Sequence, residues 1–358
     1  MSLGEERLES IRMIRDSAAA LAPRKDLKRV RALRFSEPGF DRGLWRQMCA
    51  MGWVGLRVPE LEGGSGLGMA ELCALAEELG AALVPEPLVA GVVAAHLLNG
   101  TDLADHIAGR RLFIPAWQEW AGSLEFDGGE MRLRDGRLSG RKLFVPMAAG
   151  ADAYVLSVPH GVAIVPAATE GMSRDLEQAQ DGGHYATLTL AGVPVQPIAM
   201  ERRRIADALD EAALATAAYL LGVAEQAFAL TLEYLCTRKQ FGQPIGSFQA
   251  LQHRAVDLRL QLALSRASIG GAAAVLDGEA APAARQAAVS RAKARAADAA
   301  LLVTRQAVQL HGAIGYTDEF DIGLFLRKAM TLANLYGSAA QHRARYARLT
   351  PSTAEATA

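Results

Sequence analysis

The sequence predicts an α+β protein of several domains: an N-terminal helical domain, a middle antiparallel β domain and a C-terminal helical bundle. Three observations predict this order. Apolar residues recur at three- and four-residue spacing near the N-terminus, short apolar runs bounded by glycine and aspartate fill the middle, and an alanine- and leucine-rich stretch follows. At 358 residues the chain exceeds the usual size of one hydrophobic core, so we expect domains at 1–105, 106–204 and 205–358.

The first domain is predicted to be helical. Four apolar residues share one helical face near the start of the chain: Leu8, Ile11, Ile14 and Ala18. The glycine-rich stretch 55–68, GLRVPELEGGSGLG, is expected to be a loop. The next stretch, 69–80, is expected to be a helix that ends at Gly80, because glycine is common just after the last helical turn.

The middle domain is predicted to be an antiparallel sheet or barrel, because its apolar runs are short and separated by turn-forming residues. Six runs are the expected strands: RLFIPAW (111–117), SLEFDG (123–128), RLSGRKLFVPM (137–147), DAYVLSV (152–158), GVAIVPA (161–167) and YATLTLAGVPV (185–195). From about 205 to 348 few residues interrupt a helix, so long packed helices in a bundle are expected.

Composition excludes several classes of function. The 38 Lys+Arg residues balance 39 Asp+Glu residues, so no electrostatic feature favours binding to nucleic acid or to a membrane surface. The three cysteines lie far apart and the seven histidines form no H-x-x-x-H pair, so no disulfide framework and no metal site is expected. The N-terminus has no apolar signal-peptide core. These observations favour a reducing, cytoplasmic location.

One segment interrupts the most helical part of the chain. The stretch 237–258, TRKQFGQPIGSFQALQHRAVDL, places an adjacent cationic pair, two phenylalanines and several helix breakers between two helical stretches. It is expected to end one helix, turn sharply and begin the next. Arg238 suits a phosphate ligand there, because its planar guanidinium donates paired hydrogen bonds. The alternative is that Arg238 and Lys239 only complement the dipole at the end of the preceding helix.

Three stretches, in order along the chain, resemble the acyl-CoA dehydrogenase family. Residues 238–249 read R-K-Q-F-G-Q-P-I-G-S-F-Q, similar to the family's R-K-x-F-G-x-x-I-x-x-F-Q. Residues 307–329 resemble its Q-x-x-G-G-x-G-Y segment and the arginine motif that follows. Residues 44–80 resemble the N-terminal helical domain, with its V-P-E and G-G-x-G turn. The helix, sheet, helix order is also that of the family.

The resemblance implies an FAD cofactor and names the residues that would hold it. In the family the elbow arginine, phenylalanine and glutamine contact FAD, and the Q-x-x-G-G segment approaches the same cofactor, commonly across a subunit boundary. The corresponding positions here are Arg238, Phe241, Gln249, Gln309, Gly312 and Ala313. His311 lies within this segment, either as part of the site or as a helix-end histidine without chemistry.

The flavin-ring side departs from the family pattern. Relatives carry a T-E-P-x-x-G-S-D loop, whereas this chain has a shorter, proline-free Q-E-W-A-G-S at 118–123. Relatives carry W-I-T-N or W-I-S-N, whereas this chain has F-V-P-M at 144–147. Pro146 offers neither a hydroxyl nor an N–H to the flavin. Phe144 is still able to pack on the ring.

The catalytic base departs as well. The family's chemistry removes the proton α to the thioester with a carboxylate, usually in a C-terminal Y-E-G-T motif. Tyr336 occupies that glutamate's position here, in L-Y-G-S, and a phenol is a weak base at neutral pH. Some relatives use a glutamate near the start of the first C-terminal helix, which makes Glu211 the candidate base. The alternative for Glu211 is a solvated acid beside Asp210 at a helix start.

Three functions therefore stay open. The resemblance implies an FAD-dependent acyl-CoA dehydrogenase, an oxidoreductase of fatty acid β-oxidation and related lipid metabolism, that works alone through Glu211. An altered ring side together with a missing base resembles the smaller subunits of heteromeric acyl-CoA dehydrogenases. The third reading is a noncatalytic helper or scaffold, and flavin oxidases and monooxygenases on the same fold are further alternatives. The implied partners are an acyl-CoA substrate, an electron-transfer acceptor protein, and a second copy or a related dehydrogenase subunit.

Overall fold

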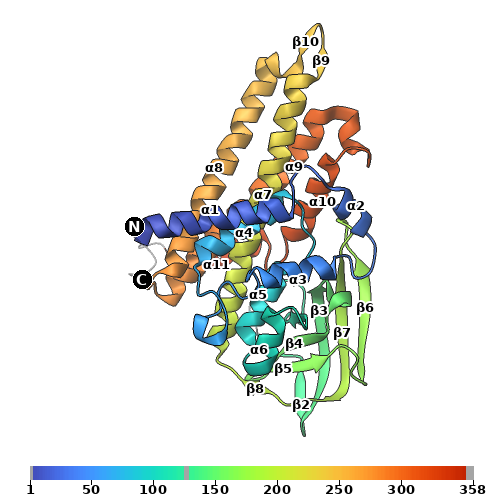
Figure 1. Ribbon diagram of the computed structural model, residues 1–358, viewed down its shortest axis with the longest axis vertical. Coiled ribbons are helices and arrows are strands. Elements are labelled where there is room, and N and C mark those ends of the chain that lie inside the picture. Colours follow the sequence, from blue (N-terminus) through green and yellow to red (C-terminus); the bar gives the residue numbers. More distant parts are fainter. Residues whose placement is uncertain (1–2, 125–128, 352–358) are drawn as a thin grey trace. The chain divides into compact units, whose positions relative to one another are not determined.

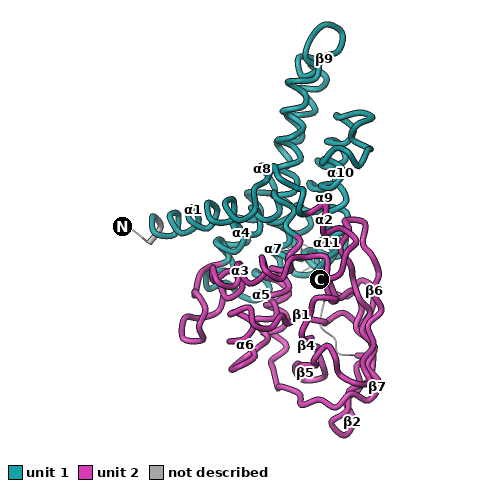
Figure 2. The backbone as a smooth tube through the Cα atoms, turned by 45° about the vertical axis from the view of Figure 1, so that its right-hand side comes forward, with its two compact units in different colours: residues 1–29, 69–84, 213–358 teal, residues 30–68, 85–212 magenta. Residues whose placement is uncertain are grey.

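The computed structural model describes residues 3–124 and 129–351, and its elements are labelled in Figure 1. The chain divides into two compact units, coloured separately in Figure 2. Unit 1 comprises Met1–Arg29, Met69–Val84 and Ala213–Ala358. Unit 2 comprises Val30–Gly68 and Pro85–Ala212. The predicted order of N-terminal helices, middle sheet and C-terminal bundle is confirmed, whereas the domain borders after 105 and 204 stay a prediction.

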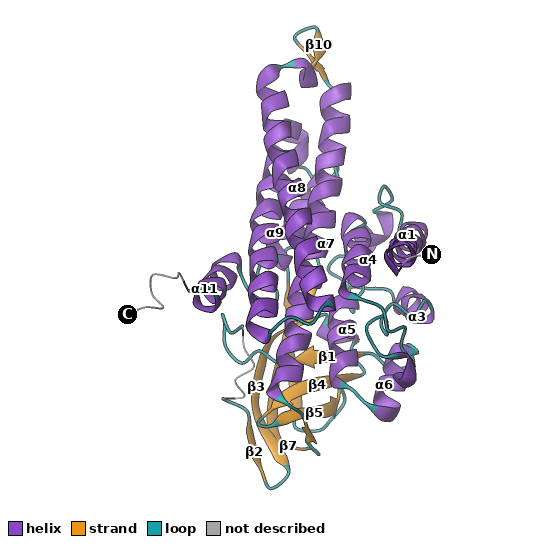
Figure 3. Ribbon diagram, turned by 90° about the vertical axis from the view of Figure 1, so that its left-hand side faces the viewer, coloured by secondary structure: helices purple, strands orange, loops and turns teal. Residues whose placement is uncertain are grey.

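Unit 1 is built from helices (Figure 3). Its helices are α1 (Leu3–Leu21), α4 (Met69–Ala81), most of α7 (Arg202–Thr237), α8 (Gln249–Asp277), α9 (Pro282–His311), α10 (Ile322–Leu332) and α11 (Ala339–Leu349), with 3-10 turns η3 (Ile245–Ser247) and η4 (Gly312–Tyr316). Helix α9 is the centre of the bundle, because α8, α10 and α11 all pack against it. Its buried face is mostly alanine, which lets neighbouring helices approach closely.

Two glycines mark the place where α4 and α7 meet. A Cβ added to Gly80 would lie 2.1 Å from the Tyr219 carbonyl oxygen, and one added to Gly222 would lie 1.9 Å from the Glu77 carbonyl oxygen. Only glycine fits at such distances. The expectation that Gly80 ends its helix is therefore wrong: α4 continues to Ala81, and Gly80 is needed for close helix packing.

Unit 2 combines helices with two four-stranded sheets. Its helices are most of α2 (Lys28–Leu33), α3 (Arg42–Ala50), α5 (Leu88–Leu97), α6 (Gly100–Ile107) and the first turns of α7, with 3-10 turns η1 (Glu60–Glu62) and η2 (Ala148–Gly150). Its strands are β1 (Phe113–Ala116), β2 (Arg132–Arg134), β3 (Arg137–Pro146), β4 (Ala153–Val158), β5 (Gly161–Pro166), β6 (Met172–Gln178), β7 (His184–Pro194) and β8 (Ile198–Ala199).

The sheets are mainly antiparallel, as predicted. One has the order β2-β3-β7-β6 and the other the order β1-β4-β5-β8. The exception is β1, which pairs parallel to β4, with Phe113 opposite Ala153. Parallel pairing is possible because a long crossover separates these strands in the chain. Strand β4 is buried along its whole length, as expected for a strand with neighbours on both edges and cover on both faces.

Three strands of unit 2 were not predicted. Strand β6 reads MSRDLEQ, and most of its residues are exposed, so it lacks the apolar alternation of a half-buried strand. Strands β2 and β8 are only 3 and 2 residues long. The predicted run 123–128 lies mostly outside the described residues, and its described part, Ser123 and Leu124, is not a strand.

Helix α7 is long and apolar enough, by length and composition, to cross a membrane. Within its most apolar window, 83% of the residues are buried inside the protein. Such burial is typical of a core helix, whose apolar side chains face protein rather than lipid.

Candidate functional site

The interruption in the C-terminal bundle is a small hairpin in unit 1. Strands β9 (Lys239–Gln240) and β10 (Gln243–Pro244) pair antiparallel between α7 and α8. The two turn residues, Phe241 and Gly242, have φ of 53° and 80°. Two-residue hairpins favour such left-handed turns, but a phenylalanine there is strained. Phe241 is also 91% exposed, so burial of its ring within this chain does not offset the backbone strain.

Arg238 stands at the base of the hairpin, one residue after α7 ends. Its side chain is exposed, and within the described chain it makes no ion pair. The Ile245 amide donates to the Arg238 carbonyl oxygen at 2.8 Å, which brings Arg238 close in the chain fold to the start of α8. Helix α8 begins at Gln249 without a side-chain cap, and its Leu251 amide donates to the Phe248 carbonyl oxygen, so the Gln249 and Ala250 amides are the ones suited to bind an anion.

An aromatic stack ties this hairpin to the end of α9. The Tyr234 and His311 rings are stacked with centroids 4.4 Å apart, and Phe320 lies 4.9 Å from the His311 ring. The Arg238 amide donates to the Tyr234 carbonyl oxygen at 2.8 Å. The stack therefore fixes the hairpin and the Gln309 segment in one region of unit 1, and their joint role in a cofactor site stays a prediction.

His311 is a buried, neutral member of the stack. Burial lowers its pKa, against the opposing hydrogen bond with Ala307. Its Nδ1 lies 2.7 Å from the Ala307 carbonyl oxygen and must donate to it, which leaves Nε2 as an acceptor. In the described part of the chain, Nε2 has no hydrogen-bond partner. The structure thus gives His311 a packing role and one unused acceptor.

The segment after α9 exposes its backbone. Gly312 has φ of 67°, a conformation that favours glycine, and a Cβ there would meet no atom within 4 Å. Gln309, Gly312 and Ala313 are all exposed, as are Phe241 and Gln249 of the hairpin side. An exposed guanidinium, an uncapped helix start and bare backbone suit a ligand with phosphate groups.

Phe144 lies in unit 2, at a β-bulge near the end of β3. It has φ of 54° and is 45% exposed, whereas the next residue, Val145, is buried. Pro146 pairs with Tyr185 in the sheet, and Met147 follows with φ of 52°. The ring of Phe144 is therefore accessible to a planar ligand, and its contact with a flavin stays a prediction.

Glu211 is buried in unit 2 and held by two basic side chains. Arg57 donates to both carboxylate oxygens, from Nη2 at 2.7 Å and from Nε at 3.2 Å. His96 Nε2 lies 3.0 Å from Oε2. Burial by itself raises the pKa of Glu211, but His96 and Arg57 outweigh it and lower that pKa to about 2. A solvated helix-start position is therefore wrong for Glu211, which lies in the third turn of α7.

The loop of Tyr336 is held by a buried lysine in unit 1. Lys293 is fully buried, and its Nζ donates to the carbonyl oxygens of Ala333 and Gly337 at 2.9 and 3.0 Å. Burial lowers the pKa of Lys293 to about 7. Burial also raises the pKa of Tyr336 above its ordinary value of 10.0, so its phenol stays protonated at neutral pH. Tyr336 is a poor proton acceptor in this position.

Two buried lysines were missed by the sequence reading. Lys142 and Lys293 are both 0% exposed, yet nothing in an alternating strand or an alanine-rich helix marks a lysine as internal. For Lys142, the sequence feature that pointed to a possible role was its position in β3, two residues before Phe144. In residues 3–124 and 129–351, no group of three or more His, Cys, Asp or Glu side chains is arranged to hold a metal ion.

Comparison with known proteins decides the family. Residues 9–102 match the acyl-CoA dehydrogenase N-terminal domain, and residues 202–349 match the acyl-CoA dehydrogenase C-terminal domain. The chain is 34% identical over 333 residues to the acyl-CoA dehydrogenase IpdE2 of Mycolicibacterium smegmatis, covering 92% of this chain and 95% of the relative. The chain belongs to the acyl-CoA dehydrogenase family. IpdE2 of Mycobacterium tuberculosis is 32% identical, with 92% of this chain and 94% of the relative covered.

Solved structures of the family have the same fold. The Tcur3481-Tcur3483 steroid ACAD G363A variant is similar with a TM-score of 0.84 at 30% identity, covering 99% of both chains. The ChsE4-ChsE5 complex from Mycobacterium tuberculosis gives a TM-score of 0.83 at 25% identity, covering 96% of this chain and 98% of that chain. This family member is therefore an acyl-CoA dehydrogenase-type protein in sequence and in fold.

Proposed function

We propose that this acyl-CoA dehydrogenase family member binds FAD and acts as one subunit of a heteromeric acyl-CoA dehydrogenase that desaturates a thioester between its α and β carbons. When bound, FAD supplies the hydride acceptor of this chemistry. The chain would supply the pyrophosphate site through Arg238 and the start of α8, with Phe241, Gln249, Gln309, Gly312 and Ala313 around it. Phe144 would pack on the flavin ring.

The heteromeric role is proposed because neither candidate base of this chain, Glu211 or Tyr336, is a good proton acceptor. The Glu211 carboxylate is bound by Arg57, and a carboxylate with a pKa of about 2 is a weak proton acceptor. At the family's usual position stands Tyr336, whose phenol stays protonated. Removal of the α proton is therefore assigned to a related partner subunit, and this chain contributes to cofactor binding and positioning.

The exposed cofactor residues support a shared site. Phe241 is strained and 91% exposed in a single chain, which is expected of a side chain that a ligand or a neighbouring subunit covers. The chain is also similar to the ChsE4-ChsE5 complex, which is named as a complex of two proteins, and this similarity supports a heteromeric assembly. We propose a cytoplasmic complex that passes its electrons to an electron-transfer protein.

The test is to purify this chain alone and together with the product of any dehydrogenase-like gene that neighbours its own. We expect flavin to bind, and we expect acyl-CoA to bleach its visible absorption only when the partner is present. Because one similar structure is named as a steroid ACAD, a steroid-derived acyl-CoA is the first substrate to try. Rapid bleaching by the single chain that disappears in Glu211→Gln would contradict the heteromeric role and favour a dehydrogenase that works alone. A colourless protein with no affinity for FAD would contradict the whole proposal.

A further inference from the structure

A buried ion pair in unit 2 joins two segments next to Phe144. The fully buried Lys142 donates from Nζ to Glu119 Oε1 at 2.6 Å and to Ser157 Oγ at 2.7 Å. The Trp117 carbonyl oxygen lies 3.4 Å from the same nitrogen. All three ammonium protons therefore have acceptors. The Lys142 ammonium group therefore connects β3 with β4 and with the loop at 117–120.

The carboxylate of the pair uses its second oxygen as well. Glu119 Oε2 accepts hydrogen bonds from the backbone amides of Glu130 and Met131. Both partners are at most 5% exposed, so loss of either one would leave the other charge unpaired in the interior. Unpaired buried charges are costly, which makes this pair sensitive to change on either side.

The same region contains a β-bulge. Lys142 is opposite Leu188 and Val145 is opposite Ala186, so β3 has one more residue than β7 between these two pairs. The Leu143 amide, inside the bulge, donates to the Gln118 carbonyl oxygen at 2.8 Å instead of joining the ladder with β7. The loop held by Glu119 thus provides the partner that the bulged backbone needs.

The bulge decides which side chain faces outward. Strict alternation from the buried Lys142 would put Phe144 inside and Val145 outside. Phe144 instead has φ of 54° and is 45% exposed, and Val145 is 1% exposed. The extra residue allows both Lys142 and Val145 to be internal, with the Phe144 ring directed away from the core.

We propose that Lys142 and Glu119 are positioning residues for the flavin: they hold the loop and the bulge together, and so present Phe144 to the flavin ring. This inference rests on the proposed FAD function. In a purely structural role, the ion pair would only stabilise unit 2. In the proposed role, Lys142 affects the bound flavin through the position of Phe144. The effects of Lys142 and Phe144 on flavin binding must then be coupled.

The experiment is a double-mutant cycle with Lys142→Met, Phe144→Ala and the combined variant. FAD affinity and the visible absorption bands of the bound flavin are measured for each, and hydrogen exchange of the 143–145 segment is measured without FAD. We expect Lys142→Met to speed this exchange and to weaken FAD binding by about tenfold, with a changed flavin spectrum. Phe144→Ala should reproduce the spectral change without the faster exchange, and the combined variant should bind no more weakly than the weaker single variant.

Strand β4 provides an internal control. Its segment 154–156 pairs with β1 and β5, so its exchange should stay slow in Lys142→Met if the variant is folded. If Lys142→Met does not fold, Glu119→Gln takes its place in the cycle, since it keeps the size of the side chain and an oxygen for Lys142.

The outcomes separate this inference from the function on which it rests. If the unaltered protein binds no FAD, the proposed function fails and the inference fails with it. If the unaltered protein binds FAD, but Lys142→Met leaves affinity and spectrum unchanged, the inference alone is overturned. Independent, additive losses from Lys142→Met and Phe144→Ala would overturn it too, because they would make the ion pair a structural element only.

Discussion

Arg57 Nη2 lies 2.7 Å from Glu211 Oε1, and this contact makes the candidate base a member of an ion pair. Both side chains are largely buried, at 16% and 7% exposed. Arg57 also donates from Nη1 to the Leu67 carbonyl oxygen at 3.0 Å, so the guanidinium is held in place from two directions. A base that reaches a substrate would have to leave Arg57 first.

The pair predicts a pH dependence of stability. The folded pKa of Glu211, about 2, is below its ordinary value of 4.5, so the unfolded chain takes up this proton first as the pH falls. The stabilisation is present above about pH 4.5 and is lost as the pH falls toward 2, and it amounts to on the order of 3 kcal/mol. We expect Glu211→Gln to unfold more easily than the unaltered protein at pH 7, measured by denaturant titration.

The difference between the two proteins should shrink as the pH falls from about 5 toward 2, because the unfolded chain binds a proton at this carboxyl before the folded chain does. Glu170→Gln is the matched control: this exposed glutamate lies in the same unit and should change the unfolding free energy little at any pH. A Glu211→Gln deficit that stays constant down to low pH would show that the ion pair does not titrate as the structure predicts.

Arg238→Ala should weaken FAD binding with no loss of helical content. The variant removes a charge-assisted hydrogen bond worth about 1.5 to 3 kcal/mol, which corresponds to about ten- to hundredfold in affinity. The measurements are FAD titration followed by flavin fluorescence and far-UV circular dichroism. Arg12→Ala, an exposed arginine of α1 in the same unit, removes the same charge at another place. Equal affinities of the two variants for FAD would remove Arg238 from the cofactor site.

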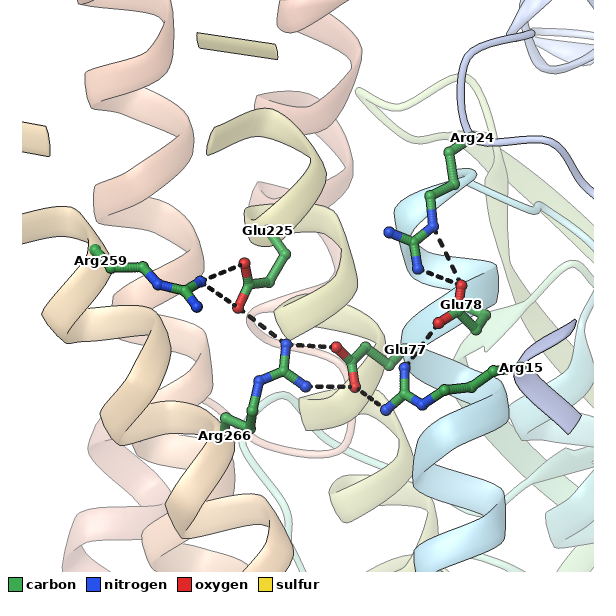
Figure 4. Close-up of polar contacts among 7 residues, drawn as sticks. All are labelled: Arg15, Arg24, Glu77, Glu78, Glu225, Arg259 and Arg266. Atoms are coloured by element: carbon green, nitrogen blue, oxygen red, sulfur yellow. Dashed lines mark hydrogen bonds and ion pairs between the residues drawn. The ribbon is translucent and has the colours of Figure 1, made fainter. Parts of the chain in front are cut away.

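Seven charged side chains connect α4, α7 and α8 with the N-terminal segment in unit 1 (Figure 4). Glu77 accepts from Arg15 at 2.7 Å and from Arg266 at 2.6 Å, and Arg266 continues to Glu225 at 2.9 Å. The remaining members are Glu78 with Arg15 and Arg24, and Arg259 with Glu225. Burial raises the pKa of Glu77, but Arg266 and Arg15 reverse this and lower it.

The burial of a side chain within this network should decide how much unfolding free energy its substitution removes. Glu77 is 8% exposed, and Glu77→Gln removes the buried carboxylate that Arg15 and Arg266 share, leaving them with Glu78 and Glu225, so we expect a loss of roughly 3 kcal/mol of unfolding free energy. The Arg259 side chain is 60% exposed, and Arg259→Ala should cost less than about 1 kcal/mol. Chemical denaturation of both variants at pH 7 measures this. Comparable losses would mean that burial does not set the strength of these ion pairs.

An exposed apolar face of α8 predicts that the protein forms an oligomer. Val256, Leu260 and Leu264 follow at four-residue spacing, and they are 58%, 54% and 54% exposed. Three large apolar side chains in one stripe are typical of a surface that another protein chain covers. We expect a dimer or a larger complex at micromolar concentration by light scattering, and Leu260→Glu should shift it toward smaller species.

A matched control comes from Leu61, which is 101% exposed in the 3-10 turn η1 of unit 2 and lies outside this stripe. Leu61→Glu should leave the molar mass unchanged. If the unaltered protein is a monomer, or if Leu260→Glu and Leu61→Glu behave alike, the α8 face is not an assembly surface.

Prediction from sequence succeeded where local pattern is enough. Five of the six expected strand runs coincide, to within a few residues, with β1, β3, β4, β5 and β7, because apolar runs between turn residues are a local signal. The polar strand β6 was missed, since it becomes a strand only through pairing with β7. Gly80 was misread for a related reason: its need for glycine comes from the Tyr219 backbone, which is distant in the chain.

The sequence by itself determined the order of helices and strands, the family resemblance and the residues of the hairpin that we propose for the cofactor, since periodicity and contiguous motifs are properties of neighbouring residues. Only the tertiary structure decided the state of the charged groups. Arg57, His96 and Glu211 come from three separate segments, and so do Glu119, Lys142 and Ser157. Whether such a carboxylate is a base or one half of an ion pair depends on which distant side chain the fold brings within hydrogen-bonding distance in a buried place.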